Sequence, residues 1–329
     1  MYKKRIIYIV FIICIILFLL LCMTNRPNLR KFTILEKYSN DLICLPATYP
    51  GSSDKTLKEF IQTSDRIIWS YWDNEQIPWV VKLALKTWKQ NQPQDCICLL
   101  TPKTLFSFID KSDLPPNYQN LFTQRQADVI RIVLLEKYGG LWMDATFLLG
   151  RNIDHLWFPK NYDIGCYEAD FFTTNPKVPV LENWFISAPK NSPLIKAWKK
   201  EFYFGLTFKT SDDYINYLKT QQFDFQKVNI PSYLMMHCSL MRVLSSPHSY
   251  TIKHFPASEK NDGPFSYLIN NNWSSTNSVR YLTKPMSSNT FIPRTIKLRG
   301  GERKALESWS CISKNSIIGK LLLKELKNN

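Results

Sequence analysis

Residues 126–149 read QADVIRIVLLEKYGGLWMDATFLL, a helical pattern and a strand pattern joined by two glycines. The spacing predicts a helix over Thr123–Tyr138, because the segment has helical length and stops at Gly139 and Gly140. The residues that follow, LWMDATFLL, are predicted to form one central β-strand. Both elements are largely apolar, yet both carry charged side chains, so this stretch indicates a core that contains a polar site.

The predicted helix carries a polar stripe on one face. Gln124, Asp128 and Arg131 lie at positions i, i+4 and i+7, and apolar residues cover the other faces. A buried charge that has no partner is costly, so these side chains must pair with each other or face a ligand. Two interpretations stay open: an internal ion pair between Asp128 and Arg131, or a binding site.

The predicted strand carries a single carboxylate. Because side chains alternate along a strand, Trp142, Asp144 and Thr146 are expected to share one face. Open α/β sheets bind ligands at the carboxyl ends of their strands. Carboxylate oxygens there suit a Mg²⁺ or Mn²⁺ ion that holds a diphosphate, so Asp144 is the candidate metal ligand. The alternative is an aspartate that makes only structural hydrogen bonds.

The segments before this stretch indicate an α/β fold. Residues 66–72 (RIIWSYW) and 96–100 (CICLL) read as buried strands. Helices are predicted from Pro78 to about Gln90 and from about Pro102 to Asp110, with Pro78 at a position where its missing N–H is harmless. This alternation is typical of βαβ units with parallel strands. Cys96 and Cys98 are expected to be buried free thiols.

The charge of the chain sits mainly in its ends. The 329 residues carry a net charge of +15. Residues 1–31 hold six basic residues and no acidic one, and residues 294–329 hold nine basic and three acidic ones, so the rest is nearly neutral. A protein that binds nucleic acid would carry a basic stripe on its folded body. A nucleic-acid partner is therefore not expected.

An apolar segment, residues 6–23, follows a short basic tail, residues 1–5. Its eighteen uncharged residues would reach about 27 Å as a helix, close to the thickness of a bilayer. We expect an anchor in contact with membrane lipid, rather than a cleaved signal peptide, because no small-residue cleavage site follows. The chain is thus predicted to be a single-pass membrane protein.

The side of the membrane is not determined, because three basic residues precede the segment and three follow it. The cytoplasmic face would suit a bacterial capsule-type protein, and the Golgi or ER lumen a eukaryotic one. Residues 24–65, polar and rich in proline, are predicted to be a stem. Residues 301–329 are predicted to be a basic tail with an amphipathic helix that lies on the membrane or caps the core.

The run from Asp128 through Arg131 and the glycine pair to Asp144 resembles the core of glycosyltransferases with a DXD sugar-binding region. It is most similar to capsular polysaccharide synthesis proteins, a group related to the initiating α-mannosyltransferases of yeast and to glucosylating toxin domains. Residues 66–78 resemble the first nucleotide-binding strand of that family, and residues 183–194 resemble another shared segment. The resemblance implies an A-type glycosyltransferase fold, with a Rossmann-like sheet and a catalytic domain over residues 66–300.

The resemblance also implies roles for individual residues. The catalytic residues would be Asp144, Arg131 and Asp128. Asp144 would bind the cation, Arg131 would neutralise phosphate or orient the sugar, and Asp128 would accept hydrogen bonds from ribose or sugar hydroxyls. Thr146 stands where stricter members carry a second Asp, which weakens the expected metal site. Trp72 would stack on the base. The expected donor-binding residues are Trp72, Asp128, Arg131, Trp142, Asp144, Thr146, Asn183 and Lys297.

The expected activity is transfer of a sugar from a UDP- or GDP-sugar to a glycan or polysaccharide acceptor, with retention and a divalent cation, Mn²⁺ or Mg²⁺. One alternative is a non-catalytic sugar-binding homologue. A sugar-phosphate transferase is disfavoured, because Asp144 is not followed by a second Asp two residues on. His237 lies in an apolar helical pattern and reads equally as a core or an active-site histidine. Lys297 and Arg299 read as diphosphate ligands or as solvated charges.

Overall fold

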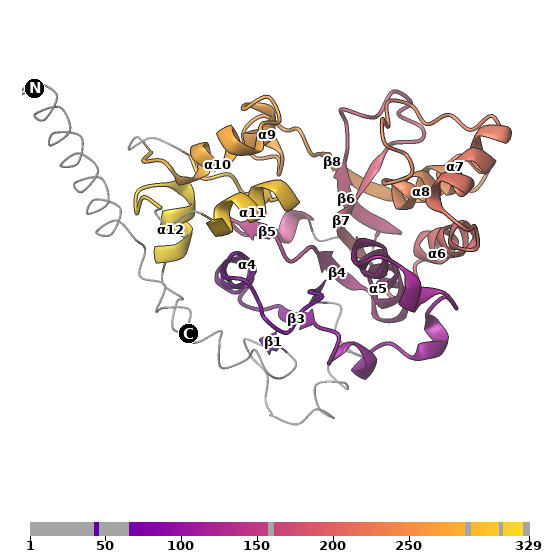
Figure 1. The fold of residues 1–329 in the computed structure, drawn as a ribbon, viewed down its shortest axis with the longest axis horizontal. Coiled ribbons are helices and arrows are strands. Elements are labelled where there is room, and N and C mark those ends of the chain that lie inside the picture. Colours follow the sequence, from indigo (N-terminus) through magenta and orange to yellow (C-terminus); the bar gives the residue numbers. More distant parts are fainter. Residues whose placement is uncertain (1–42, 46–65, 157–160, 287–290, 309–311, 325–329) are drawn as a thin grey trace, which may run out of the picture.

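A mixed β-sheet forms the centre of the molecule (Figure 1). The computed structural model describes residues 43–45, 66–156, 161–286, 291–308 and 312–324. Within these residues the sheet has seven strands in the order β1-β3-β2-β4-β7-β6-β8. The strands are β1 (Ile43–Leu45), β2 (Ile67–Tyr71), β3 (Cys96–Leu100), β4 (Gly140–Met143), β6 (Ile164–Glu168), β7 (Leu181–Ala188) and β8 (Ile252–Pro256).

The predicted βαβ unit is confirmed. Strands β2 and β3 are parallel, with Ile67 opposite Cys96, and helix α4 (Trp79–Asn91) connects them. Strand β4 lies parallel to β2 on its other side. The remaining pairs are mixed, because β7 is antiparallel to both β4 and β6, whereas β8 is parallel to β6. The fold is therefore a mixed α/β structure around a central sheet.

Helix α5 has the predicted bounds, Thr123–Tyr138, and two glycines turn the chain from it into β4. Gly139 and Gly140 have φ values of +69° and +93°, a region that residues with a Cβ atom rarely adopt. A Cβ atom on Gly140 would also lie 2.6 Å from the carbonyl oxygen of Ile67. Glycine is thus required where the helix delivers the chain to the sheet.

The single strand predicted over residues 141–149 is wrong. Strand β4 ends at Met143, and the backbone N–H of Asp144 still donates to the carbonyl of Trp184 at 2.9 Å. A turn follows, and β5 (Phe147–Leu149) pairs instead with β9 (Thr295–Lys297) in a separate two-stranded sheet. The chain changes sheets because a distant segment offers a second pairing edge. Asp144 therefore lies just past a strand end rather than inside a strand.

The helix predicted over residues 102–110 is also wrong. Only a short 3-10 turn forms there, at Leu105–Ser107, and a second one follows at Lys111–Asp113. The hydroxyl of Thr104 accepts the backbone N–H of Thr101 at 2.9 Å. Side chains that bond to nearby backbone in this way compete with helix formation.

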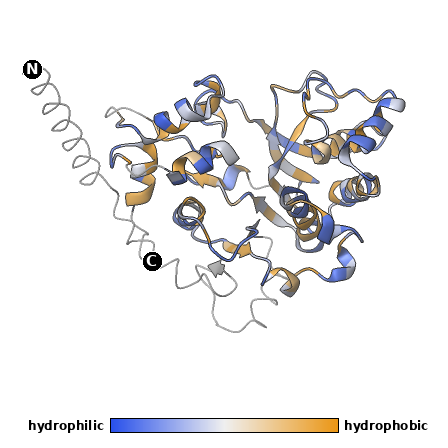
Figure 2. Cartoon of the chain, in the orientation of Figure 1, coloured by the Kyte–Doolittle hydropathy of each residue, from blue (hydrophilic) through white to orange (hydrophobic). Residues whose placement is uncertain are grey.

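Helices cover both faces of the sheet. Ile67 and Trp69 pack into one core with α5, and Ile68, with alternating direction, packs into the other core beside α4. Figure 2 shows helices with hydrophobic and hydrophilic sides, as expected for a layer between a sheet and solvent. The other helices are α6 (Pro193–Leu206), α7 (Ser211–Thr220), α8 (Met235–Leu244), α9 (Ser266–Ile269), α10 (Ser275–Thr283), α11 (Gly300–Ser308) and α12 (Ile317–Leu323).

The C-terminal segment belongs to the second core. Ile317 and Ile318 of α12 are fully buried, and the ammonium group of Lys86 in α4 donates to the carbonyl of Leu322 at 2.5 Å. Of the two roles predicted for this amphipathic helix, it takes that of capping the core. Residues 43–45 of the predicted stem pair with β3. Cys96 and Cys98 are buried thiols that form no disulfide, as predicted.

The prediction of a single-pass membrane protein is not supported. Within the part of the chain that the structure describes, no helix combines the length and apolar character needed to cross a membrane. Contact with membrane lipid through an anchor is therefore unsupported as well. The predicted anchor itself, residues 6–23, lies outside the described residues.

Candidate functional site

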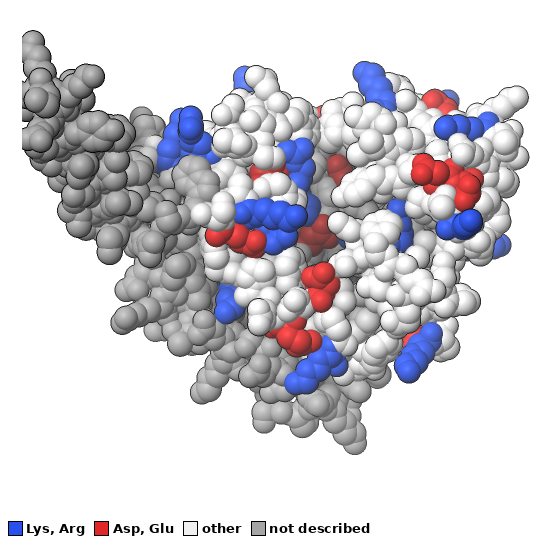
Figure 3. All heavy atoms as spheres, in the orientation of Figure 1, with Lys and Arg blue, Asp and Glu red and all other residues white. Residues whose placement is uncertain are grey.

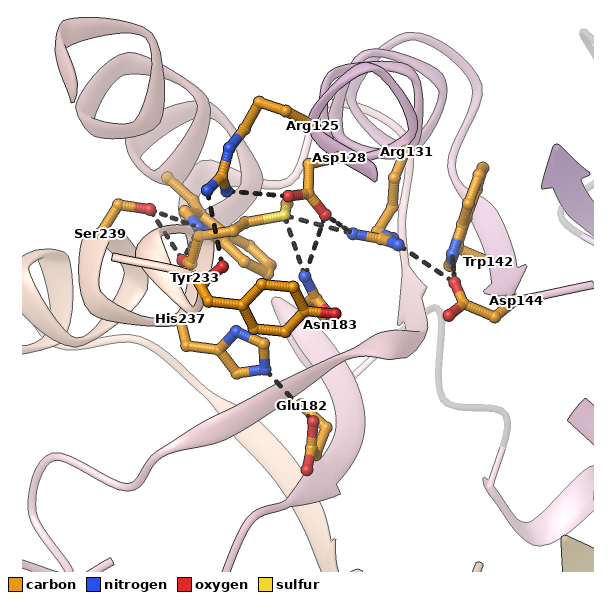
Figure 4. Close-up of polar contacts among 12 residues, drawn as sticks. Arg125, Asp128, Arg131, Trp142, Asp144, Glu182, Asn183, Tyr233, His237 and Ser239 are labelled. Carbon is orange, nitrogen blue, oxygen red and sulfur yellow. Dashed lines mark hydrogen bonds and ion pairs between the residues drawn. The ribbon is translucent and has the colours of Figure 1, made fainter. Parts of the chain in front are cut away.

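Asp128 is the centre of a buried polar network on α5 (Figure 4). One of its carboxylate oxygens accepts from Arg131 at 2.5 Å and from the Asn183 amide at 3.1 Å. The other accepts from Arg125 at 3.0 Å. The internal Asp128–Arg131 pair is thus present, but it is one link in a larger network. Such a network fixes the direction of every member, because each buried charge has a partner.

The network extends from Asp128 to Asp144 through a single guanidinium. Arg131 donates from its second terminal nitrogen to Oδ1 of Asp144 at 3.0 Å. Its guanidinium also lies over the Trp142 ring, 4.9 Å from the centroid, and the Trp142 indole N–H donates to the same Oδ1 at 2.9 Å. Trp142 is buried, so its position suits orienting Asp144.

Lys297 approaches Asp144 from the other side. Its ammonium group donates to Oδ2 of Asp144 at 2.7 Å and to the hydroxyl of Thr146 at 3.3 Å. Thr146 in turn donates to the carbonyl of Leu298 at 2.8 Å. Although Thr146 is not on the predicted strand face, the turn after Asp144 brings it to the same lysine. Lys297 is thus a buried, paired cation and not a solvated charge, and its role as a diphosphate ligand stays a prediction.

The network reaches solvent at Asp144. The Asp144 side chain is 27% exposed, against 5% for Arg131 and 9% for Lys297. Figure 3 shows the molecule hollowed near the middle of the view, with acidic side chains inside the hollow. Three cations (Arg125, Arg131 and Lys297) and two carboxylates leave the network with an excess positive charge. An anionic ligand suits such a site.

The surroundings of Asp144 stabilise its ionised form. Burial acts to raise the pKa of its carboxyl group, but the charges of Lys297 and Arg131 and the hydrogen bonds from Lys297 and Trp142 outweigh burial and lower the pKa. Asp144 is therefore a carboxylate at neutral pH. It is unsuited to act as a proton donor, and it holds two cations in fixed positions.

Trp72 lies at the same end of the sheet as Asp144. It directly follows β2, as Asp144 directly follows β4, and these two strands are parallel. The guanidinium of Arg303 lies 5.2 Å from the centroid of the Trp72 ring. The carboxyl ends of parallel strands are where open sheets bind ligands, so this edge is the candidate site.

The residues around Asp144 fit a resident divalent cation poorly. Oδ1 accepts two N–H groups and Oδ2 accepts the Lys297 ammonium, so both oxygens already have cationic or N–H partners. Among the described residues, no group of three or more His, Cys, Asp and Glu side chains is placed to hold a metal ion. A dication next to two fixed positive charges would be repelled. The metal stays a prediction from the sequence.

The family model for capsular polysaccharide synthesis proteins matches residues 33–291, well over half of the chain. This chain belongs to that family. The match includes Trp72, Asp128, Arg131, Asp144 and Asn183, whereas Lys297 lies six residues beyond it.

Relatives of this chain are named as glycosyltransferases. O-glycosyltransferase braB of Annulohypoxylon truncatum is 29% identical over 157 residues, which cover 43% of this chain and 37% of that protein. Glycosyltransferase afumC of Aspergillus fumigatus is 28% identical over 176 residues, 46% of this chain and 43% of that protein. The chain spans less than half the length of these relatives.

A solved structure, PaToxG Glycosyltransferase, covers 66% of this chain and 86% of its own at 16% identity. The TM-score is 0.34. A similarity of this size does not establish a shared fold, so family membership rests on the sequence match.

Two members of the network were missed from the sequence. Arg125, which is buried and bonds Asp128, stands at i−3 from it, and the spacing 125, 128, 131 was a readable signal. Gln124, assigned to the stripe instead, is exposed. Met236 of α8 receives N–H contacts at 3.3 Å from both Arg131 and Asn183, a pairing that no local pattern indicates.

Other candidate residues of this family member lie in separate contacts. His237 is buried and lies 3.2 Å from the Glu182 carboxylate, so it is a partnered core histidine that borders the network in Figure 4. Arg299 pairs with the buried Glu302 at 2.7 Å and lies over Trp273. Arg299 is thus committed to a structural ion pair, unlike Lys297.

Proposed function

We propose that this chain is a glycosyltransferase that moves a sugar from a UDP- or GDP-sugar to a hydroxyl of a glycan or polysaccharide acceptor, with retention. The observation that carries the proposal is the Asp144 carboxylate, held between Arg131 and Lys297 just past the end of β4. Family membership and the names of the relatives support the same activity.

Each part of a nucleotide sugar has a chemical counterpart at this edge. Arg131 and Lys297 offer charge-assisted hydrogen bonds to a diphosphate. Asp128 and Asn183 offer an acceptor and a donor to sugar or ribose hydroxyls. Trp72 offers an aromatic ring to the base. The proposal includes an A-type, Rossmann-like fold. In it, the nucleotide would bind at the carboxyl ends of the parallel strands β3, β2 and β4.

The test is incubation of the purified chain with a panel of UDP- and GDP-sugars, with release of UDP or GDP as the measured product. We expect one donor to be turned over, slowly with water and faster with a glycan acceptor. The anomeric configuration of the product, read by NMR, checks retention. Loss of turnover in Arg131→Met, with unfolding unchanged, would tie the activity to this site.

Three results would contradict the proposal. Turnover that survives in Arg131→Met would place the activity elsewhere. Tight binding of a nucleotide sugar without turnover, under any acceptor condition, would instead support the non-catalytic sugar-binding alternative. Absence of both binding and turnover across the panel would remove the nucleotide sugar as the ligand.

A further inference from the structure

We infer that Lys297 takes the place of a divalent cation, so that this site handles the donor diphosphate without a metal; the inference rests on the function proposed above. It concerns the residue that lies outside the family match and that the structure places on Asp144. Three observations carry it: the occupancy of the Asp144 oxygens, the rigid support of Lys297, and the position of Thr146.

The first observation is that Asp144 has little room for a cation. Oδ2 accepts the Lys297 ammonium at 2.7 Å, and Oδ1 accepts Arg131 at 3.0 Å and the Trp142 indole at 2.9 Å. A metal ion would have to displace one of these groups. Lys297 already supplies a positive charge at hydrogen-bond distance from the carboxylate that a metal would use.

The second observation is that Lys297 is fixed in place. It ends β9 opposite Phe147, its backbone N–H donates to Pro264 at 3.0 Å, and its carbonyl accepts the Tyr267 hydroxyl at 2.8 Å. Because these contacts fix the backbone of β9 at Lys297, they restrict the position of the Lys297 ammonium group. Preorganised charge of this kind stabilises a leaving group without reorganisation at the moment of reaction.

The third observation concerns the hydrogen bonds of the ammonium. An ammonium carries three N–H donors. Among the described residues, Asp144 and Thr146 accept from Lys297, which leaves one donor for a phosphate oxygen. Thr146 stands where the resemblance implies a second carboxylate in stricter members, and here its neutral hydroxyl accepts from the lysine. A second carboxylate would add negative charge that this arrangement does not need.

The transfer step balances without a metal. The bond between the anomeric carbon and the diphosphate oxygen breaks, and its electron pair stays on the diphosphate beside Lys297 and Arg131. The acceptor oxygen bonds to the anomeric carbon, and its proton passes to the departing diphosphate. The products are the glycoside and the nucleoside diphosphate, and no further reactant is required.

The first experiment uses the whole chain after dialysis against EDTA. We expect donor turnover in excess EDTA to equal turnover with added Mn²⁺, and the electron paramagnetic resonance signal of Mn²⁺ mixed with the protein alone to remain that of the free ion. Turnover that EDTA abolishes and Mn²⁺ restores would overturn the inference while leaving the glycosyltransferase function intact. Tight stoichiometric binding of Mn²⁺ to the protein alone would overturn it without any activity measurement.

The second experiment compares variants at one position. We expect Lys297→Met to lower turnover by about 100-fold or more, because it removes a preorganised charge at the leaving group. Mn²⁺ should not restore it. Lys297→Arg, which keeps the charge, should retain metal-free turnover, and Lys284→Met, at an exposed lysine, is the matched control.

The third variant at this position replaces the positive charge with a negative one. Lys297→Asp places a second carboxylate beside Asp144, so it should acquire Mn²⁺ binding and turnover that depends on Mn²⁺. Thermal unfolding of each variant separates a lost charge from a lost fold. Full activity of Lys297→Met in EDTA would overturn the inference, and absence of turnover in every variant and in the parent chain would overturn the proposed function itself.

Discussion

Asp144 joins two cations that come from different elements, Arg131 from α5 and Lys297 from β9. We expect Asp144→Asn to destabilise the fold by roughly 1–3 kcal/mol at neutral pH, because it leaves Lys297 buried without an anion. Because the folded pKa of Asp144 lies below the ordinary value of 3.8, its contribution is complete above that value and is lost as the pH falls below it.

Urea unfolding of the parent chain and of Asp144→Asn over a range of pH measures this contribution. The difference in the free energy of unfolding should stay constant near neutral pH and shrink in acid. A difference that persists unchanged at acid pH would mean that the charge of Asp144 is not what holds Lys297.

Asp128 serves two buried guanidinium groups, those of Arg125 and Arg131. We expect Asp128→Asn to cost about 3–5 kcal/mol of stability, because both cations lose their common anion inside the protein. Asp110→Asn is a matched control, since Asp110 pairs with Lys137 at a 72% exposed position. The control should cost less than about 1 kcal/mol. Equal losses in the two variants, measured by urea unfolding, would mean that burial does not set the cost.

The sequence predicted which side chains of α5 and β4 matter but not all of their partners. Asp128, Arg131 and Asp144 are recognisable because charges are rare inside apolar periodic segments. Arg125 lies on the same helix face and bonds Asp128, but the predicted stripe does not include it. Lys297 was one of two cations in a short segment, and only the pairing of β9 with β5 distinguishes it from Arg299. Such a long-range pairing leaves no local trace in the sequence.

At the scale of elements, the glycine pair between α5 and β4 is the most constrained connection. We expect Gly140→Ala to destabilise the fold by at least about 2 kcal/mol, because the residue has a positive φ and its Cβ would meet the Ile67 backbone. Gly300→Ala, at a position with nothing within 4 Å, should change stability by less than about 1 kcal/mol. Thermal unfolding compares the two variants. Similar midpoints would mean that the turn at Gly140 does not require glycine.

Elements with a strong local pattern were predictable, and those decided by distant pairing were not. The bounds of α5 follow from its length and its terminal glycines, and α4 begins just after Pro78 as expected. The division of residues 141–149 into β4 and β5 depends on β9, about 150 residues away. The predicted helix after β3 failed because Thr104 bonds locally to the backbone of Thr101.

At the scale of the whole molecule, the C-terminal segment closes one face of the fold over α4. We expect Ile318→Ala to cost about 2–5 kcal/mol, because the side chain is fully buried in the second core. Lys320→Ala, on the exposed side of the same helix, should change stability by no more than about 0.5 kcal/mol. Urea unfolding measures both. An Ile318→Ala variant as stable as the parent chain would show that the packing of Ile318 in α12 does not contribute to the stability of the fold.

The sequence separation between Asp144 and Lys297 also determines the order in which the contacts of Asp144 can form during synthesis. Asp128 and Arg131 are three residues apart and can meet as soon as α5 forms, within about a microsecond. Lys297 is 153 residues beyond Asp144, so at about 5–20 residues per second the ribosome delivers it roughly 8–30 s later. During that interval Arg131 is the one of these two cations that Asp144 can bind. Asp144 therefore pairs with both cations only in a molecule whose synthesis has passed β9.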